Sequence, residues 1–155
     1  MNQIATESAT SNGYLSPDRI RRRIKMLEVE QALMGFEQID PGVTHFMHGD
    51  TYIRSMFIPA GLLIVGRIHA TDHTCMIEGD VYVSDEFTDE HYQGFIMFHS
   101  PSGSKRIVRT ERDSRFTTIH HIPGAGNMTV EEIEAIICYT NYADYEDSLA
   151  LEVKE

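Results

Sequence analysis

The sequence predicts a mainly β fold, a sandwich or barrel, with one α-helix before it and one after it. Between residues 43 and 122, short apolar runs of β type alternate with turn sequences, and no helical pattern interrupts them. Seven such runs within about 80 residues argue for a sandwich or barrel rather than a parallel sheet. The 155-residue chain is long enough for a single domain with its own core.

The N-terminal part of the chain predicts an arm followed by a helix. Residues 1–15 are small and polar and show no apolar period, so we expect a polar N-terminal arm without regular structure of its own. The Ser-Pro-Asp sequence at 16–18 supplies an N-cap hydroxyl, a proline in the first turn and an early acidic residue. Apolar residues then recur near helical spacing until Gly35, which predicts an amphipathic basic helix over 16–35.

The barrel itself is predicted over residues 43–122. Its turns contain Pro, Gly, Asp and Ser, which are typical of reversals between short strands. We expect strands at 51–58, 62–69, 73–77, 80–84, 94–100, 105–110 and 115–122.

A second helix is predicted after the barrel. Thr129 and Glu132 have the spacing of a capping box, and isoleucines at helical spacing follow them. Residues 127–155 are therefore expected to form a C-terminal helix that ends in an acidic tail.

The charge distribution excludes some classes of partner. A formal net charge of −11 argues against general nucleic-acid binding, which needs a basic surface. Basic residues crowd the helix at 16–35 while acidic residues dominate the C-terminal segment, a contrast that could join subunits, join the two ends of one chain, or reflect a solvated helix face. The sequence has no apolar run long enough to span a membrane, so we expect no membrane association.

The cysteines predict a reducing location. Cys75 and Cys138 lie in apolar segments without CxxC spacing, a context in which thiols are usually inert, and no secretory signal pattern is present. We therefore expect a cytoplasmic protein with reduced thiols.

Two histidines stand out in the strand-like region. His69 and His73 are separated only by Ala-Thr-Asp. Along one continuous strand they would lie about 13 Å apart, from a rise of about 3.3 Å per residue. Two imidazoles can share a metal ion only if the chain reverses between them, and Asp72 favours such a turn without requiring it.

This spacing resembles the first motif of the cupin family, small β-barrels of the jelly-roll class. Gly61 is followed by Arg67 and His69 where the motif has its two histidines, then by His73 where it has glutamate, and then by Gly79. The resemblance implies a cupin-type jelly-roll β-barrel, flanked here by the N-terminal and C-terminal helices.

The second cupin motif resembles residues 94–106, with one additional residue and with Arg106 in the place of its histidine. Residues 58–69, 101–106 and 117–120 also look like segments of small cupin-like proteins encoded by tailed bacteriophages. That likeness covers residues 52–120 and implies the fold without implying a particular reaction.

If the family's metal site is kept, the resemblance implies an altered set of ligands. His69 and His73 would remain, and His120 could supply a third imidazole if the hairpin register points it inward. Three neutral imidazoles would suit a divalent ion such as Zn, Fe, Ni or Mn. Two alternatives are a histidine-lined pocket without metal and histidines scattered on the outer surface.

The two substituted arginines lead to a second hypothesis. If Arg67 and Arg106 face inward, each brings a permanent charge that needs an anion beside it. A small anionic ligand, a carboxylate or phosphate, is one candidate, and structural pairing with Glu78, Asp80 or Glu111 is the other. The remaining histidines are expected on the surface or in loops: His45, His48, His91, His99 and His121.

These observations leave the biological role open between classes. One hypothesis is a metal-binding cupin with an anionic ligand; another is a non-catalytic structural or virion-associated assembly protein that uses the barrel as an oligomeric scaffold; a third is a regulatory ligand-binding module. We expect a homo-oligomer or a larger assembly, located in the host cytoplasm or the virion if the chain is phage-encoded. The sequence does not decide whether the protein is an enzyme.

Overall fold

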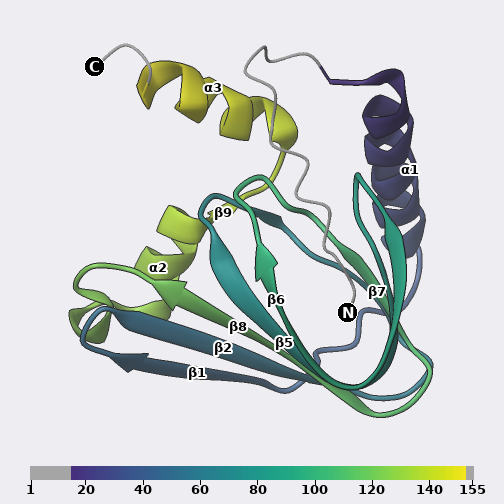
Figure 1. The fold of residues 1–155 in the computed structure, drawn as a ribbon, viewed down its shortest axis with the longest axis horizontal. Helices are drawn as coiled ribbons and strands as arrows, with labels where there is room; N and C mark the ends of the chain where they lie inside the picture. The colour runs from purple at the N-terminus through teal and green to yellow at the C-terminus, as the bar shows by residue number, and fades with distance from the viewer. Residues whose placement is uncertain (1–14, 153–155) are drawn as a thin grey trace, which may run out of the picture.

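The computed structural model describes residues 15–152, so the predicted arm up to residue 14 and the tail from residue 153 lie outside the described residues. An antiparallel sheet curls into a half-barrel, with helices at both ends of the described chain (Figure 1). This arrangement confirms the mainly β fold class. The elements are α1 (Pro17–Leu33), β1 (Val43–His48), β2 (Thr51–Ile58), β3 (Leu63–Val65), β4 (Ile68–His69), β5 (His73–Ser84), β6 (Asp89–Ser100), β7 (Ile107–Thr110), β8 (Ser114–His121), the short 3₁₀ helix η1 (Ala125–Asn127), α2 (Val130–Ile137), β9 (Cys138–Tyr139) and α3 (Tyr142–Glu152).

Strand β5 organises the seven-stranded sheet, whose order is β1-β2-β8-β5-β7-β3 with β6 paired to β5. Along one edge, β5 pairs with β6 over its whole length. Along the other edge it pairs first with β8, over Thr74–Glu78, and then with β7, over Val81–Ser84. The exchange of partners coincides with the bend that curls the sheet.

Gly79 lies where the partners of β5 change, at a position where the sequence predicts a turn between two strands. The structure has one long strand instead. Gly79 has a φ of +142°, and a Cβ there would lie 2.8 Å from Ser114 Cα, so only glycine allows β8 to approach this closely. A strand can bend at such a glycine without ending.

The predicted strand at 62–69 is divided in two by the structure. Its first part, β3, pairs with β7 in the large sheet, while its last two residues, β4, pair with β9 in a separate two-stranded sheet. Gly66 marks the crossing, and its N–H donates to the carbonyl of Arg106 at 2.8 Å. The structure also has a strand, β1, that is not among the seven predicted.

The C-terminal segment is more broken than the single predicted helix. Thr129 and Glu132 form the expected capping box, but α2 ends at Ile137 and the chain then extends into β9 before α3 begins. Because β9 pairs with β4, a segment outside the range predicted for the barrel completes its end beside His69.

Every second side chain along the strands faces the interior of the half-barrel. On β2, Tyr52, Met56 and Ile58 are buried and face the same side of the sheet. Two buried clusters fill the half-barrel. One contains Met56, Ile58, Ile77, Val81, Val83 and Val108, and the other, at the end near α2, contains Tyr52, Ile122, Ala125, Ile133 and Ile137.

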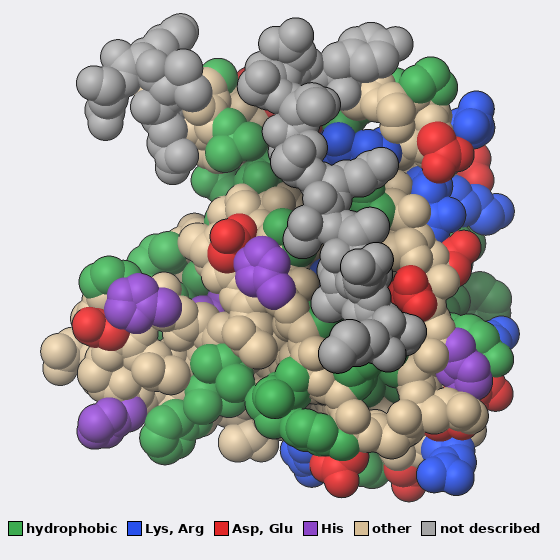
Figure 2. Space-filling model, viewed as in Figure 1, with side chains coloured by type: hydrophobic (Ala, Val, Ile, Leu, Met, Phe, Trp, Pro, Cys, Tyr) green, Lys and Arg blue, Asp and Glu red, His purple; other side chains and the backbone are tan. Residues whose placement is uncertain are grey.

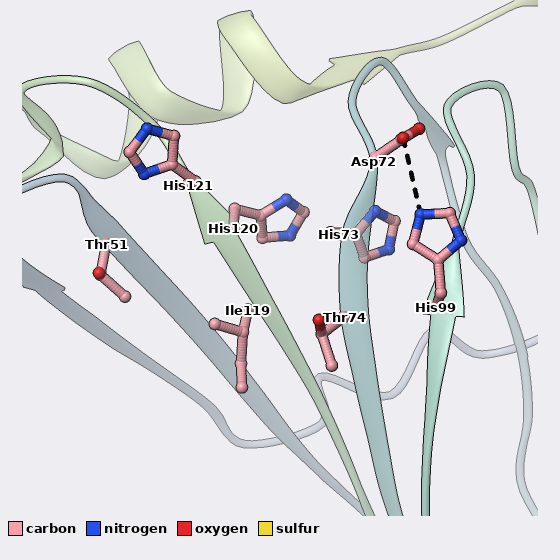
Figure 3. A pocket seen from close by; sticks show the side chains of 8 residues that line it. All are labelled: Thr51, Asp72, His73, Thr74, His99, Ile119, His120 and His121. Carbon is pink, nitrogen blue, oxygen red and sulfur yellow. Dashed lines mark ion pairs between the residues drawn. The ribbon is translucent and has the colours of Figure 1, made fainter.

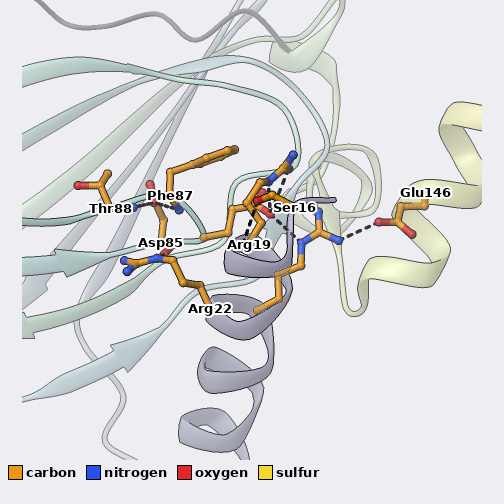
Figure 4. A network of polar contacts seen from close by, with 9 residues as sticks. Ser16, Arg19, Arg22, Asp85, Phe87, Thr88 and Glu146 are labelled. Carbon is orange, nitrogen blue, oxygen red and sulfur yellow. Dashed lines mark hydrogen bonds and ion pairs between the residues drawn. The ribbon is translucent and has the colours of Figure 1, made fainter. Parts of the chain in front are cut away.

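The basic helix α1 is neutralised within the chain (Figure 4). Buried Glu86, in the β5–β6 turn, accepts from Arg19 at 3.2 Å and from Arg23 at 2.7 Å, and Arg23 also reaches Glu146 of α3 at 2.8 Å. Arg22 donates to Asp89 at 2.7 Å. Of the alternatives that the charge contrast left open, the structure therefore shows contact between the two ends of one chain, and basic and acidic side chains alternate on this side of the surface (Figure 2).

A buried ion pair also fastens α1 to the barrel. The Lys105 ammonium group, only 1% exposed, lies 3.0 Å from the Glu30 carboxylate, which is 40% exposed. A cation this buried is tolerated only while its counter-ion stays in place. Among residues 15–152, the structure contains no helix that is both long and apolar enough to cross a membrane.

Replacing Glu30 with alanine should lower the free energy of unfolding by about 2 kcal/mol or more, because it leaves the Lys105 charge buried and unpaired. Chemical denaturation measures this loss. The control is Glu28→Ala, which removes an exposed residue of the same helix lying 3.9 Å from Lys25 and should cost less than about 0.5 kcal/mol. Lys105→Met should partly restore the stability of the Glu30→Ala variant, and a double variant no more stable than the single one would contradict this account.

Candidate metal centre

Backbone contacts place His69 at the end of the half-barrel. Its N–H donates to the Ser104 carbonyl at 2.9 Å, and its carbonyl accepts from Gly103 N–H at 2.7 Å. Gly103 has a φ of +86°, and a Cβ there would meet the Tyr145 hydroxyl at 2.8 Å. His69 is therefore held between the 101–104 turn and β9.

The chain reverses between His69 and His73, as the metal hypothesis requires. Ala70 N–H donates to the carbonyl of Ile137 at 2.7 Å, which ties the reversal to the end of α2. The Asp72 carboxylate accepts from the backbone N–H of Ser102 at 2.7 Å, and the Ser102 hydroxyl donates to the Ala70 carbonyl at 2.6 Å. Side chains and backbone thus fix a three-residue turn that returns the chain into β5.

The structure brings His69, His73 and His120 together. The ring centroids of His69 and His73 are 4.3 Å apart, and His120 lies 4.6 Å from His73 and 5.7 Å from His69. One ring nitrogen of each histidine lies within 4.8 Å of the others. His120 is 1% exposed and faces inward beside its cross-strand partner Tyr52, so the register of β2 and β8 selects the inward face.

Each of the three rings has at least one nitrogen that forms no hydrogen bond within the described chain. His73 Nδ1 lies 3.0 Å from the Thr71 carbonyl, which can only accept, so Nδ1 carries the proton and Nε2 presents its lone pair. His120 Nε2 bonds to the Thr118 hydroxyl at 3.1 Å. Within the described chain His69 Nδ1, His73 Nε2 and His120 Nδ1 are buried without a hydrogen-bond partner. Anchoring the second ring nitrogen in this way is how proteins orient metal-binding histidines.

Electrostatics keep the three imidazoles neutral. Burial lowers the pKa of His69 to about 3, with further contributions from His73, His120, Arg106 and Arg54. Burial and the neighbouring His73 lower the pKa of His120 to about 4, and burial also lowers the pKa of His73. Only the neutral form offers a lone pair to a metal ion, so the cluster is in its ligating form at neutral pH.

The two predicted arginines occupy different environments. Arg106 is half-buried near the cluster, where it donates to the Ser100 hydroxyl at 2.7 Å and lies 5.3 Å from the centre of the Phe98 ring. The Arg67 side chain is 60% exposed and lies 3.8 Å from Glu134. The structure does not bring Arg67 to the histidines, because the crossing at Gly66 turns it outward.

The acidic residues suggested as structural partners of these arginines pair elsewhere in the described chain. Asp80 accepts from His91 at 2.7 Å and from Gln93 at 3.2 Å, and Glu111 pairs with Arg109 at 3.0 Å. Glu78 forms no ion pair within residues 15–152. Arg106 likewise has only neutral partners there.

One inward-facing arginine was missed by the sequence interpretation. Arg54 lies between buried Tyr52 and buried Met56 in the alternation of β2, and its cross-strand partner is Thr118. Its charge contributes to lowering the pKa of both His69 and His120. The sequence signal for Arg54 was a charged residue at a position that alternation assigns to the apolar face of a strand.

A pocket of about 330 Å³ reaches the cluster from the outer face of the sheet. It lies where β5 and β8 separate above their last paired residues, Thr74 and Ile119 (Figure 3). Its lining includes His73 and His120 of the cluster, and also His99 and Asp72, which lie 3.6 Å apart.

The other histidines are dispersed rather than gathered at the centre. They lie in strands instead of loops, and all are exposed or half-buried: His45, His48, His91, His99 and His121. His45 bonds to the Tyr52 hydroxyl at 2.8 Å. Cys75 and Cys138 are reduced, and burial raises the pKa of Cys75 to about 11, so neither behaves as a reactive thiol at neutral pH.

No protein-family model and no curated protein matches this sequence. Several solved structures are similar in fold. A cupin-2 domain-containing protein of Shewanella frigidimarina is 16% identical, with a TM-score of 0.41 over 64% of this chain and 97% of that one. A cupin superfamily protein of Desulfitobacterium hafniense is 11% identical, with a TM-score of 0.44 over 56% of this chain and 84% of that one.

A third similar structure is a protein with a double-stranded β-helix domain from Klebsiella pneumoniae. It is 11% identical, with a TM-score of 0.48 over 59% of this chain and 84% of that one. These partial likenesses leave the chemistry of the centre to be derived from the residues of this chain.

The metal-free protein should lose stability as the pH falls from 7 towards 4. In the unfolded chain these histidines take up a proton near pH 6.5, whereas folded His120 and His69 do so only near pH 4 and 3. The unfolded state therefore binds more protons across this range, so acid favours unfolding.

Urea denaturation at a series of pH values measures this dependence. His120→Gln should flatten the fall between pH 6.5 and 4, whereas His48→Gln, which changes an exposed histidine of β1, should keep the wild-type slope. Equal slopes in all three proteins would show that the buried cluster does not control acid stability.

Proposed function

We propose that this chain is a cupin-fold protein whose His69, His73 and His120 bind one divalent metal ion. One observation carries the proposal: three histidines from three strands lie with one ring nitrogen of each within 4.8 Å of the others, and each has a buried ring nitrogen without a hydrogen-bond partner in the described chain. Burying such groups unsatisfied costs free energy, and a metal ion would satisfy all three at once.

The donor set suits borderline metals. Three neutral imidazoles with further positions open are compatible with Zn, Fe, Ni or Mn, while oxygen-seeking Ca and Mg are disfavoured. A metal bound there would act as a Lewis acid towards a ligand in the open positions. Thr71 and Thr118 would orient His73 and His120 through the hydrogen bonds described above.

We further propose that the centre receives a small anionic ligand. Arg106 supports this idea, because its permanent charge lies near the histidines and its recorded partners are the hydroxyls of Ser100 and Ser104 and the Phe98 ring. An anion beside Arg106 could also occupy an open metal position.

Metal analysis of the untagged protein should find about one ion per chain after reconstitution and dialysis. His69→Ala, His73→Ala and His120→Ala should each lower the metal content at least about tenfold, because two imidazoles hold an ion far less tightly than three. The matched control is His121→Ala, which removes the exposed neighbour of His120 and should leave the content unchanged. Wild-type protein that retains less than about 0.1 ion per chain would refute the metal centre.

A non-catalytic scaffold is the second candidate, and the outer face of the sheet favours it. Phe46, Phe57, Phe95 and Met97 point away from the interior and are 40–61% exposed. The pairings Phe57–Arg115, Arg115–Glu78 and Glu78–Phe95 make this a continuous face across four strands. Hydrophobic side chains gather on the lower part of the surface in Figure 2. Exposed apolar surface of this kind is typical of contacts between proteins. The resemblance to phage-encoded proteins implies a location in the host cytoplasm or the virion, and the cysteines imply a cytoplasmic one; both are part of this proposal.

If the scaffold hypothesis is correct, light scattering should find a dimer or larger oligomer, and the double variant Phe95→Ser/Met97→Ser should dissociate it to monomers. Its metal content should not change, because both side chains lie on the face opposite to the histidines. A wild-type protein that is monomeric at about 100 µM would exclude an oligomeric scaffold, since a specific interface of standard size binds more tightly than this.

A further inference from the structure

The interior of the half-barrel holds two arginines with no acidic partner in the described chain. Arg54 enters from β2, and Arg106 precedes β7. Both are half-buried. The neighbouring Arg67 and Arg109 do have such partners, in Glu134 and Glu111.

Strand pairing places Arg54 next to the histidine cluster. It shares the inner face of β2 with Tyr52, which is opposite His120, and it is itself opposite Thr118, whose hydroxyl bonds to His120. Directly opposite side chains in an antiparallel pair have Cβ atoms about 5 Å apart. The guanidinium group of Arg54 is therefore within reach of the cluster from the β2 side.

Arg106 approaches from a different wall. Its guanidinium donates to the hydroxyls of Ser100 and Ser104, which lie at the end of β6 and in the following turn. Ser100 is opposite His73 in the pairing of β6 with β5, and the Ser104 carbonyl accepts from the His69 N–H at 2.9 Å. Both arginines therefore lie beside the histidine cluster, while no carboxylate in the described chain pairs with either one.

This arrangement is costly unless an anion completes it. A guanidinium group does not lose its proton in a protein, so a half-buried arginine without an acid keeps its charge in a medium that solvates it poorly. Two such groups around neutral imidazoles make a local positive potential in a chain whose net charge is −11. The potential disfavours a metal ion alone and favours one accompanied by negative charge.

We propose that Arg54 and Arg106 form an anion subsite at the three-histidine centre and that its ligand is a small oxyanion of charge −2, a dicarboxylate or a phosphate group. This inference rests on the proposed function and extends it by adding Arg54 and by requiring two negative charges rather than one. Each guanidinium offers a fork of N–H donors that matches carboxylate or phosphate oxygens. The ligand's remaining oxygen atoms are then free to face the metal.

Isothermal titration calorimetry at low ionic strength tests the subsite with malonate, succinate, inorganic phosphate and acetate as probes. The zinc-loaded protein should bind at least one dianion at least about tenfold more tightly than acetate. Preference for malonate or succinate over phosphate, or the reverse, identifies the class. Dianion affinity no higher than that of acetate would overturn the proposal.

Charge-removing variants show whether the arginines are responsible. Arg54→Met and Arg106→Met should each weaken the preferred dianion at least about tenfold, the effect expected for losing a charge-assisted pair of hydrogen bonds. Arg54→Lys should recover only part of the affinity, because an ammonium group lacks the fork. The matched control is Arg67→Met, which removes the same charge two residues from His69 at an exposed position and should change the affinity less than about twofold.

Stability without ligand separates a binding role from a structural one. If Arg54 is present for an anion, Arg54→Met should unfold at the same or a higher urea concentration than wild type when no ligand is added. A clear loss of stability, or equal weakening of dianion binding by Arg54→Met and Arg67→Met, would overturn the subsite.

Metal content, measured on the same samples, distinguishes the two proposals. Arginine-dependent dianion binding by a chain that takes up no metal would refute the metal centre and leave the subsite standing. Full metal loading, together with dianion binding that Arg54→Met does not change, would refute the subsite and leave the metal centre standing.

Discussion

The reversal of the chain between His69 and His73 is the constraint on which the site depends. Four residues of extended strand would separate the two rings by about 13 Å, at about 3.3 Å per residue. In the structure the ring centroids are only 4.3 Å apart. Hydrogen bonds hold the turn in place: Ala70 bonds to Ile137, and Asp72 bonds to Ser102. The turn is thus stabilised by two segments far away in the sequence, and the C-terminal helices help to hold the histidine cluster in place.

Burial and charge make the interior of the half-barrel suited to both a cation and an anion. The histidines are held neutral, so they can donate lone pairs to a cation, whereas Arg54 and Arg106 stay charged and attract an anion. A metal ion with its own anionic ligand would meet both preferences in one volume. The buried charges of Glu86 and Lys105 are paired within the chain, Glu86 with Arg19 and Arg23 and Lys105 with Glu30. The interior arginines, which have no acidic partner in the described chain, differ from them.

Local signals in the sequence were sufficient for much of the fold. The Ser16 cap, the Thr129–Glu132 capping box and the limits of β2 appear in the structure where hydrogen-bonding chemistry and alternation predict them. Prediction was wrong where a distant segment decides the outcome. Gly79 resembles a turn until β8 is packed against it, and β4 separates from β3 because β9 offers it a partner.

The same distinction applies to the site. His69, His73 and His120 could be proposed from motif spacing and hairpin geometry, because each depends on one reversal or one register. Arg67 could not be placed, since the crossing at Gly66 decides which way it faces. Arg54 was overlooked although the alternation of β2 puts it on the buried face. An ionisable residue on an apolar strand face is a signal that can be sought directly in other sequences.

Anomalous diffraction from crystals of the zinc-loaded protein, recorded on both sides of the zinc absorption edge, tests the central claim most directly. The account predicts one strong peak per chain, bonded at about 2.1 Å to a ring nitrogen of each of His69, His73 and His120. A peak bonded to other residues, or an interior with no peak although the crystals contain zinc, would contradict it.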